Sequence, residues 1–279
     1  MDAFSSLVIS SVELAAALDK LTSNEGHELI LLDIRSTEDY ESSHIPGALR
    51  LDPGLLNRSE PPQNGLLPSA EQVATWSAQL GLDIGSNVVV YDGGKSTSAA
   101  RALWVLNVFG FTNVHWLNGG ITAWMSSNHS VSNTVTKASR AIPDRPLTAD
   151  SNLVLSSEEL KARLSNSSQQ NQIVDARTRG EYEGSDVRSA RGGRMPGAVH
   201  YEWLDMFQSD GTLLPDNELQ AALTERNLDK EVPAVVYCQS HQRSSVTYLV
   251  LKHLGYKDVS ALDGAWSNWG NDPTAPIEI

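Results

Sequence analysis

The chain contains the same pattern twice, and this repeat constrains its fold more than any other feature. Residues 88–92 (VVVYD) return as residues 234–238 (AVVYC), about half a chain length later. Residues 114–124 (VHWLNGGITAW) return in the same way as residues 259–269 (VSALDGAWSNW). A repeat of this length indicates that one folding unit is built twice, and 279 residues are enough for two domains that each bury a core.

Three further matches predict secondary structure in each copy. They are a Ser-x-x-Glu sequence before a helical pattern (10–13, 156–159), an apolar strand ending in Asp-x-Arg (31–35, 173–177) and a Pro-Gly-Ala turn (46–48, 196–198). Ser-x-x-Glu is the capping box of a helix N-terminus. Short β-branched runs alternate with helical patterns, which is typical of parallel strands joined by crossovers. We therefore predict an α/β fold with two tandem domains, each an open, mostly parallel sheet flanked by helices.

The segment between the copies has the composition of a linker. It is rich in Ser, Thr and Asn, contains Pro143 and Pro146, and shows no sustained periodicity. We expect a first domain over residues 1–127, a linker over 128–147 and a second domain over 148–279.

Net charge limits the partners of this chain. The formal net charge is −13 and the pI is near 4.9, so nucleic acid and anionic membranes are not expected partners, because both require a basic surface. No run of about 20 apolar residues and no secretory signal is visible, and we expect a cytoplasmic protein that has no membrane segment.

Cys238 is the only cysteine, which excludes an intramolecular disulfide, a Cys-x-x-Cys redox pair and a multi-thiolate metal site within one chain. It directly follows the strand expected over residues 234–237, and open parallel sheets bind ligands beyond the carboxyl ends of their strands. Five polar residues come next, and then a helical pattern begins at Ser244. Amides and the helix dipole at such an N-terminus stabilise a thiolate. The alternative is a buried, inert cysteine.

The helix N-terminus alone does not activate this thiol. It supplies about 0.3 to 1 kcal/mol, or up to about 2 kcal/mol when partly buried, and one pKa unit corresponds to about 1.4 kcal/mol. A low thiol pKa therefore also requires the loop amides and the charge of Arg243, for which an ion pair to Asp175 or to the first domain is the alternative role. The expected anion-binding loop consists of Gln239, Ser240, His241, Gln242, Arg243 and Ser244.

The length of this loop distinguishes between two chemistries. Cysteine phosphatases have Cys-x5-Arg and a loop that surrounds phosphate, whereas only four residues separate Cys238 from Arg243. A smaller ring suits one sulfur atom better than a tetrahedral oxyanion. The sequence therefore favours sulfur chemistry, with a cysteine phosphatase or arsenate reductase on the same scaffold as the alternative.

Together these features resemble the tandem-domain rhodanese family, the thiosulfate sulfurtransferases. The resemblance covers nearly the whole chain and rests on the duplication, the Pro-Gly-Ala turns and three local sequences (238–244, 175–177, 117–120). It implies two rhodanese-like domains, of which the second is catalytic and the first has lost its nucleophile. Asp92 stands at the position of Cys238, and a carboxylate cannot carry sulfane sulfur, so we predict an inactive first domain. A nucleotide-binding P-loop around Lys95 is excluded because Val89 stands where that motif needs glycine.

The resemblance also implies a mechanism. Cys238 would take the outer sulfur of thiosulfate or a related donor and form a persulfide. It would then pass the sulfur to cyanide or to a thiol, which can belong to a small molecule or to an acceptor protein. Because the chain has no second cysteine, the second step must be intermolecular. No metal and no organic cofactor are expected. A non-catalytic sulfur carrier or sensing module is a further alternative.

Two departures from the family pattern bear on the donor. The loop matches neither the mercaptopyruvate type, Cys-Gly-Ser-Gly-Val-Thr, nor the classical thiosulfate type, Cys-Arg-Lys-Gly-Val-Thr, and it resembles a bacterial Cys-Gln-Thr-His-His-Arg type. We expect thiosulfate or a related donor, with 3-mercaptopyruvate less favoured. Classical members also have a donor-binding Arg where this chain has Glu181. Four nearby arginines are candidates to replace it, with a solvated, salt-bridged loop as the alternative: Arg179, Arg188, Arg191 and Arg194.

Aromatic residues and one histidine complete the candidate site. We take Trp203 and Arg179 as candidate pocket residues, and the spacing of Trp266 and Trp269 predicts a packed helix face. His241 either hydrogen-bonds sulfur or a departing anion, or stabilises the loop.

Overall fold

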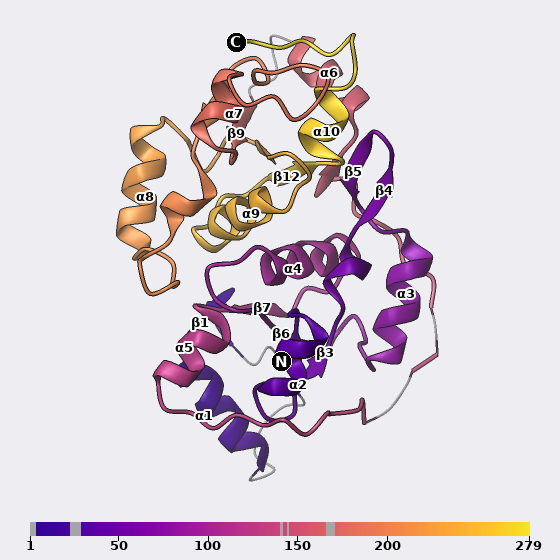
Figure 1. Cartoon of the computed structure of the whole chain (residues 1–279), viewed down its shortest axis with the longest axis vertical. Helices are drawn as coiled ribbons and strands as arrows, with labels where there is room; N and C mark the ends of the chain where they lie inside the picture. Colours follow the sequence, from indigo (N-terminus) through magenta and orange to yellow (C-terminus); the bar gives the residue numbers. More distant parts are fainter. Residues whose placement is uncertain (1–3, 23–28, 140–141, 144, 166–170) are drawn as a thin grey trace. The chain divides into compact units, whose positions relative to one another are not determined.

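Each half of the chain forms a five-stranded parallel sheet in the computed structural model, which describes residues 4–22, 29–139, 142–143, 145–165 and 171–279. The strand order is β1-β7-β6-β2-β3 in the first sheet and β8-β12-β11-β9-β10 in the second, and every neighbouring pair in these two sheets is parallel. The repeat in the sequence is therefore a repeat in topology, and the predicted α/β fold is confirmed (Figure 1).

The first sheet has short edge strands and longer central strands. Its strands are β1 (Val8–Ile9), β2 (Leu29–Asp33), β3 (Leu49–Arg50), β6 (Asn87–Tyr91) and β7 (Val114–Leu117). The helices around it are α1 (Ser11–Thr22), α2 (Thr37–Ser42), η1 (Pro53–Leu56), α3 (Ala70–Gln79), α4 (Ser98–Val108) and α5 (Gly120–Ser126). The side chains of α1 and α5 pack on one sheet face with those of β6.

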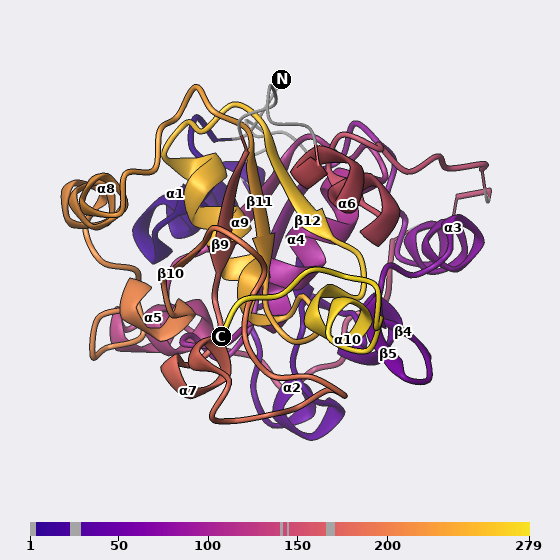
Figure 2. The same ribbon diagram turned by 90° about the horizontal axis from the view of Figure 1, so that it is seen from above.

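The second sheet repeats this plan. Its strands are β8 (Val154–Leu155), β9 (Gln172–Asp175), β10 (Ala198–His200), β11 (Ala234–Tyr237) and β12 (Val259–Leu262). The helices are α6 (Ser157–Ser165), α7 (Arg179–Glu183), η2 (Trp203–Met206), α8 (Asp216–Glu225), α9 (Arg243–His253) and α10 (Ala265–Trp269). Figure 2 shows β9, β11 and β12 side by side, with β11 in the middle.

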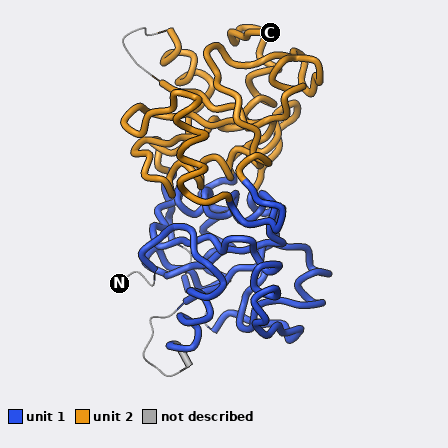
Figure 3. The backbone as a smooth tube through the Cα atoms, turned by 90° about the vertical axis from the view of Figure 1, so that its left-hand side faces the viewer, with its two compact units in different colours: residues 1–56, 68–149, 207–213 blue, residues 57–67, 150–206, 214–279 orange. Residues whose placement is uncertain are grey.

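The chain divides into two compact units that exchange a segment (Figure 3). Unit 1 consists of Met1–Leu56, Pro68–Ala149 and Phe207–Leu213, and unit 2 of Asn57–Leu67, Asp150–Met206 and Leu214–Ile279. The hairpin of β4 (Arg58–Glu60) and β5 (Gln63–Leu66) thus comes from the first half of the sequence but belongs to the unit that contains Cys238.

Local chemistry explains where the first helix of each half begins. Ser10 and Glu13 form both hydrogen bonds of a capping box. The Ser10 amide donates to Oε2 of Glu13 over 2.8 Å, and the Glu13 amide donates to Oγ of Ser10 over 3.2 Å. Ser156 and Glu159 form the same pair of bonds at the same distances. The capping boxes predicted from the sequence are confirmed.

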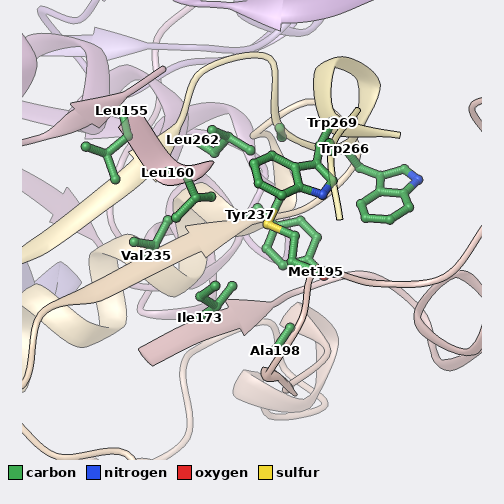
Figure 4. Packing of buried hydrophobic residues seen from close by; sticks show 12 residues of the cluster. Leu155, Leu160, Ile173, Met195, Ala198, Val235, Tyr237, Leu262, Trp266 and Trp269 are labelled. Atoms are coloured by element: carbon green, nitrogen blue, oxygen red, sulfur yellow. The ribbon is translucent and has the colours of Figure 1, made fainter. Parts of the chain in front are cut away.

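The core of unit 2 lies on one face of its sheet (Figure 4). Alternate residues of β11, Val235 and Tyr237, point to this face, as the two-residue period of a strand requires. Trp266 and Trp269 of α10 pack against them and are 1% and 0% exposed, so their prediction as core residues is confirmed. Large rigid side chains therefore support the strand that precedes Cys238.

A buried ion pair repeats at the end of the second strand of each half. Arg177 donates to both carboxylate oxygens of Asp175 over 2.6–3.1 Å, and Arg35 does the same to Asp33. The hydroxyl of Tyr237 donates to the Asp175 carboxylate over 2.5 Å. Arg243 therefore does not pair with Asp175, whose partners are already provided, and that alternative for Arg243 is wrong.

Candidate active site

Cys238 is the first residue after β11, at the carboxyl end of the central region of the second sheet. Its carbonyl accepts the Trp266 amide over 2.9 Å, which ties the start of the loop to α10. The residue is 1% exposed. Burial alone would suit an inert cysteine, so the surroundings of the sulfur decide between the two interpretations.

The loop after Cys238 is held by hydrogen bonds of its own residues. Nδ1 of His241 lies 2.6 Å from Oγ of Ser244, and the His241 carbonyl accepts Oγ of Ser245 over 2.6 Å. His241 is fully buried and has a positive φ of 50°, whereas the next residue, Gln242, has φ −87° and ψ −62°. Two successive residues of opposite hand turn their amides toward one concavity, a geometry that binds anions. The two hydrogen bonds join His241 to the first turn of α9.

Several loop amides are left for a ligand. In the part of the chain that the structure describes, the amides of Gln239, Ser240 and Gln242 donate to no protein acceptor. The side chains are anchored instead: Nε2 of Gln239 donates to Oγ of Ser189 over 3.1 Å, and Nε2 of Gln242 donates to Oδ1 of Asn57. The loop is therefore fixed by its side chains while its backbone donors remain available.

Arg243 brings a positive charge to the sulfur. Its guanidinium donates two hydrogen bonds to Glu181, from Nη1 to Oε2 over 2.5 Å and from Nη2 to Oε1 over 2.8 Å. Against the effect of burial, the electrostatic interaction with Cys238 helps to raise the pKa of Arg243. α9 begins at Arg243, one residue earlier than the sequence predicted, so this side chain leaves from the first turn of the helix.

Glu181 is the functional neighbour that sequence reasoning missed. Its side chain is fully buried, and burial acts to raise its pKa, but the hydrogen bonds and charge of Arg243 outweigh burial and lower the pKa to about 2. The pKa of Arg243 is raised, because the hydrogen bonds to Glu181 and the charges of Cys238 and Glu181 outweigh its burial. The sequence signal was the Thr178-x-x-Glu181 capping box, which fixes this carboxylate at the start of α7.

The four arginines expected to replace a donor-binding Arg have other partners. Their contacts are Arg179 with Glu183 at 3.7 Å, Arg188 with Asp186 at 2.9 Å, Arg191 with the carbonyls of Ala275 and Trp269, and Arg194 with Glu278 at 3.4 Å. The Arg179 side chain is 64% exposed. Trp203 is half-buried in η2, where its amide donates to the Ala176 carbonyl over 3.3 Å.

The equivalent loop of unit 1 is filled by a carboxylate. Oδ1 of Asp92 accepts the Gly94 amide over 3.0 Å, and Oδ2 accepts the Ala99 amide over 2.9 Å. Asp92 is 1% exposed, and burial raises its pKa against the effect of these bonds. The amides that a ligand would use are thus already bound by the residue at the position of Cys238.

The β4–β5 hairpin contacts the loop of Cys238 within unit 2. Gly65 has φ 70°, and a Cβ atom on it would lie 2.0 Å from the carbonyl oxygen of Ser240. The Leu67 amide donates to Oδ1 of Asp263 over 2.7 Å, and the Asn64 amide donates to Oγ of Ser267 over 2.8 Å. This contact was not predicted from the sequence. The signal for it was a repeated motif, Gly-Leu-Leu-Pro ending at Pro68 and Gly-Thr-Leu-Leu-Pro ending at Pro215.

In the described ranges, no group of three or more His, Cys, Asp or Glu side chains is arranged to hold a metal ion. Among the described helices, none combines the length and the apolar character needed to cross a membrane.

This geometry belongs to a known class. The model of the rhodanese-like domain matches residues 13–127 and 156–272, so the chain belongs to the rhodanese family with two tandem copies. It is 35% identical over its whole length to the thiosulfate sulfurtransferase of Azotobacter vinelandii, of which it also covers 100%. It is 35% identical over 90% of its length to the thiosulfate sulfurtransferase of Pseudomonas aeruginosa, of which it covers 92%. The resemblance noted in the sequence is confirmed.

A solved structure supports the fold alone. The anaerobic ergothioneine biosynthesis enzyme of Chlorobium limicola, in complex with trimethyl histidine, superposes with a TM-score of 0.84 at 22% identity. The match covers 98% of this chain and 70% of that one.

Proposed function

We propose that this protein is a sulfurtransferase that moves sulfane sulfur from thiosulfate to cyanide or a thiol through a persulfide on Cys238. One observation carries the proposal. The only cysteine of the chain lies at the carboxyl end of β11, beside the guanidinium of Arg243, in a loop where several described amides donate to no protein acceptor. The names of full-length relatives at 35% identity support the same reaction.

The first half-reaction loads the sulfur. The thiolate of Cys238 attacks the outer sulfur of thiosulfate, a new S–S bond forms, and the old S–S bond breaks with its electron pair leaving on sulfite. Arg243 and the loop amides stabilise the negative charge on the thiolate and then on the terminal sulfur of the persulfide. The total charge of thiolate plus thiosulfate equals that of persulfide plus sulfite, so no oxidant is needed.

The second half-reaction unloads it. Cyanide attacks the terminal sulfur, thiocyanate leaves, and the thiolate of Cys238 is restored. A thiol acceptor would receive the sulfur as its own persulfide. Because the chain has no second cysteine, the acceptor is another molecule, either small or a protein. The proposed reaction needs no metal and no organic cofactor, and we propose that it takes place in the cytoplasm.

We propose that only unit 2 loads sulfur. In unit 1 the equivalent position carries Asp92, which has no sulfur and already binds the loop amides. The first half then contributes the hairpin that contacts the Ser240 carbonyl.

Mass spectrometry of the intact protein tests the proposal. After incubation with thiosulfate, the protein should gain the mass of one sulfur atom, and cyanide should remove that mass and release thiocyanate. Cys238→Ser should gain nothing, and a gain by this variant would contradict the proposal. Parallel rates with thiosulfate and 3-mercaptopyruvate identify the donor, and aryl phosphate turnover without sulfur transfer would favour a phosphatase instead.

A further inference from the structure

The guanidinium beside Cys238 is shared with a buried carboxylate. Arg243 ends the six-residue loop that begins at Cys238, and both of its terminal nitrogens donate to Glu181 over 2.5 and 2.8 Å. The Glu181 side chain is fully buried, whereas that of Arg243 is 17% exposed. The cation of the Cys238 loop is therefore paired with a buried carboxylate.

The position of the carboxylate is fixed independently of Arg243. Oε2 of Glu181 also accepts the Thr178 amide over 3.1 Å and the Thr178 hydroxyl over 3.0 Å, which is the capping box of α7. Nε of Arg188 lies 3.6 Å from Oε1, but this guanidinium is half exposed and donates to Asp186 over 2.9 and 3.0 Å. Among the described residues, Arg243 is the cation that is hydrogen-bonded to Glu181.

This pairing changes what an anion meets at Cys238. Bidentate pairing keeps Glu181 ionised and Arg243 cationic, so the two charges largely cancel at a distance. Coulomb energy is proportional to the charge of the ligand, so the repulsion by Glu181 is twice as large for a dianion as for a monoanion of the same shape. A ligand without charge does not respond to the pair in this way.

We propose that Glu181 determines the charge selectivity of the Cys238 site, weakening the binding of dianions relative to monoanions. This inference rests on the proposed function only for its choice of ligands, and it specifies the donor class. Organic thiosulfonates carry the same sulfane sulfur as thiosulfate but one negative charge instead of two. Compared with a site that has Arg243 but not Glu181, this site should therefore favour monoanionic donors over thiosulfate.

Glu181→Gln removes the charge and leaves the local fold supported. Glutamine is compatible with a capping box, as Ser69 and Gln72 at the start of α3 demonstrate in this same chain. The matched control is Glu183→Gln, which makes the same charge change two residues away on α7, where the side chain is 56% exposed and pairs with Arg179. Neither substitution touches Cys238.

The probes are sulfate and methanesulfonate, a dianion and a monoanion of similar shape, and binding is measured by calorimetry. In Glu181→Gln the dissociation constant of sulfate should fall on the order of tenfold and that of methanesulfonate only about threefold, because the logarithm of the change scales with ligand charge. Glu183→Gln should change either constant by less than about twofold. Equal changes for both anions, or no change for sulfate, would overturn the proposal.

A double variant covers the case in which Glu181→Gln does not fold. E181Q/R243Q leaves no unpaired charge in the buried pair, and sulfate should bind within about threefold of the unmodified protein, since the two lost charges offset one another. If the affinity of E181Q/R243Q for sulfate fell more than about tenfold, Arg243 would bind anions with its full charge in the unmodified protein, and the proposal would be wrong. These binding measurements require no turnover, so a failure of sulfur transfer would be seen separately as the absence of a persulfide.

Discussion

Replacing Gly65 with alanine should impair the Cys238 loop, although the two residues lie in different halves of the sequence. The added Cβ would lie 2.0 Å from the Ser240 carbonyl oxygen and 2.7 Å from its carbonyl carbon, where an ordinary contact is 3.4 Å or longer. Both obstructing atoms are backbone, so either the hairpin or the loop must move by more than an ångström. The φ of 70° adds a cost of about 1–2 kcal/mol for a residue with a side chain.

The expected loss follows from the displacement. A shift of about 1 Å in a positioned catalytic group can lower activity about 100-fold, so we expect kcat/KM for thiosulfate and cyanide to fall about ten- to hundredfold. The free energy of unfolding should fall by more than the roughly 1–2 kcal/mol of backbone strain, because the collision adds to it. Initial rates of thiocyanate formation and urea denaturation measure the two effects separately.

Gly211→Ala is the matched control for Gly65→Ala. Gly211 has φ 86°, and its Cβ would approach the Lys95 amide nitrogen to 3.3 Å, so the substitution has the same backbone strain with little collision. It lies in unit 1, beside the loop that carries Asp92. We expect this variant to lose only the roughly 1–2 kcal/mol of backbone strain and to keep sulfur transfer within about twofold of normal. If Gly65→Ala were as active as Gly211→Ala, the argument that the hairpin positions the loop would be refuted.

Three further predictions concern buried charges. The pKa of Glu181 is about 2 in the folded protein against 4.5 ordinarily. Its ion pair should therefore contribute about 3 kcal/mol to the free energy of unfolding above pH 4.5, and this contribution should be lost as the pH falls toward 2. The difference in stability between the parent protein and Glu181→Gln, measured by urea denaturation, should shrink over that range. Asp175→Asn should lower the free energy of unfolding by about 3–5 kcal/mol, because it leaves Arg177 buried without its carboxylate, whereas exposed Asp186→Asn should change it by less than about 1 kcal/mol. Asp92→Ala should lower stability by about 1–3 kcal/mol through its orphaned amides and leave thiocyanate formation unchanged; a loss of that activity would show that unit 1 takes part in the chemistry.

Local signals account for what could be predicted from the sequence. The apolar run before Cys238 is β11 over the predicted residues, and both capping boxes form, because these features depend on neighbouring residues. The pairing of Glu181 with Arg243 could not be read in this way, since 62 residues separate them and only the fold brings them together. The two-residue strands β1 and β8 are too short to leave a period in the sequence.

The exchange of segments between the units could not be predicted from the sequence, for a different reason. A repeat shows that two halves share a plan, but it does not show which half completes which core. Asn57–Leu67 and Phe207–Leu213 each belong to the unit formed mainly by the other half. No periodicity or capping residue encodes that choice, which depends on tertiary contacts such as that of Gly65 with Ser240.

This exchange bears on why a half without a nucleophile persists. Cutting the chain in the linker would separate Asn57–Leu67 from the unit it completes, and the reactive loop would lose the backbone that covers Ser240. Neither half can then be removed without also removing a segment of the unit that the other half mainly forms.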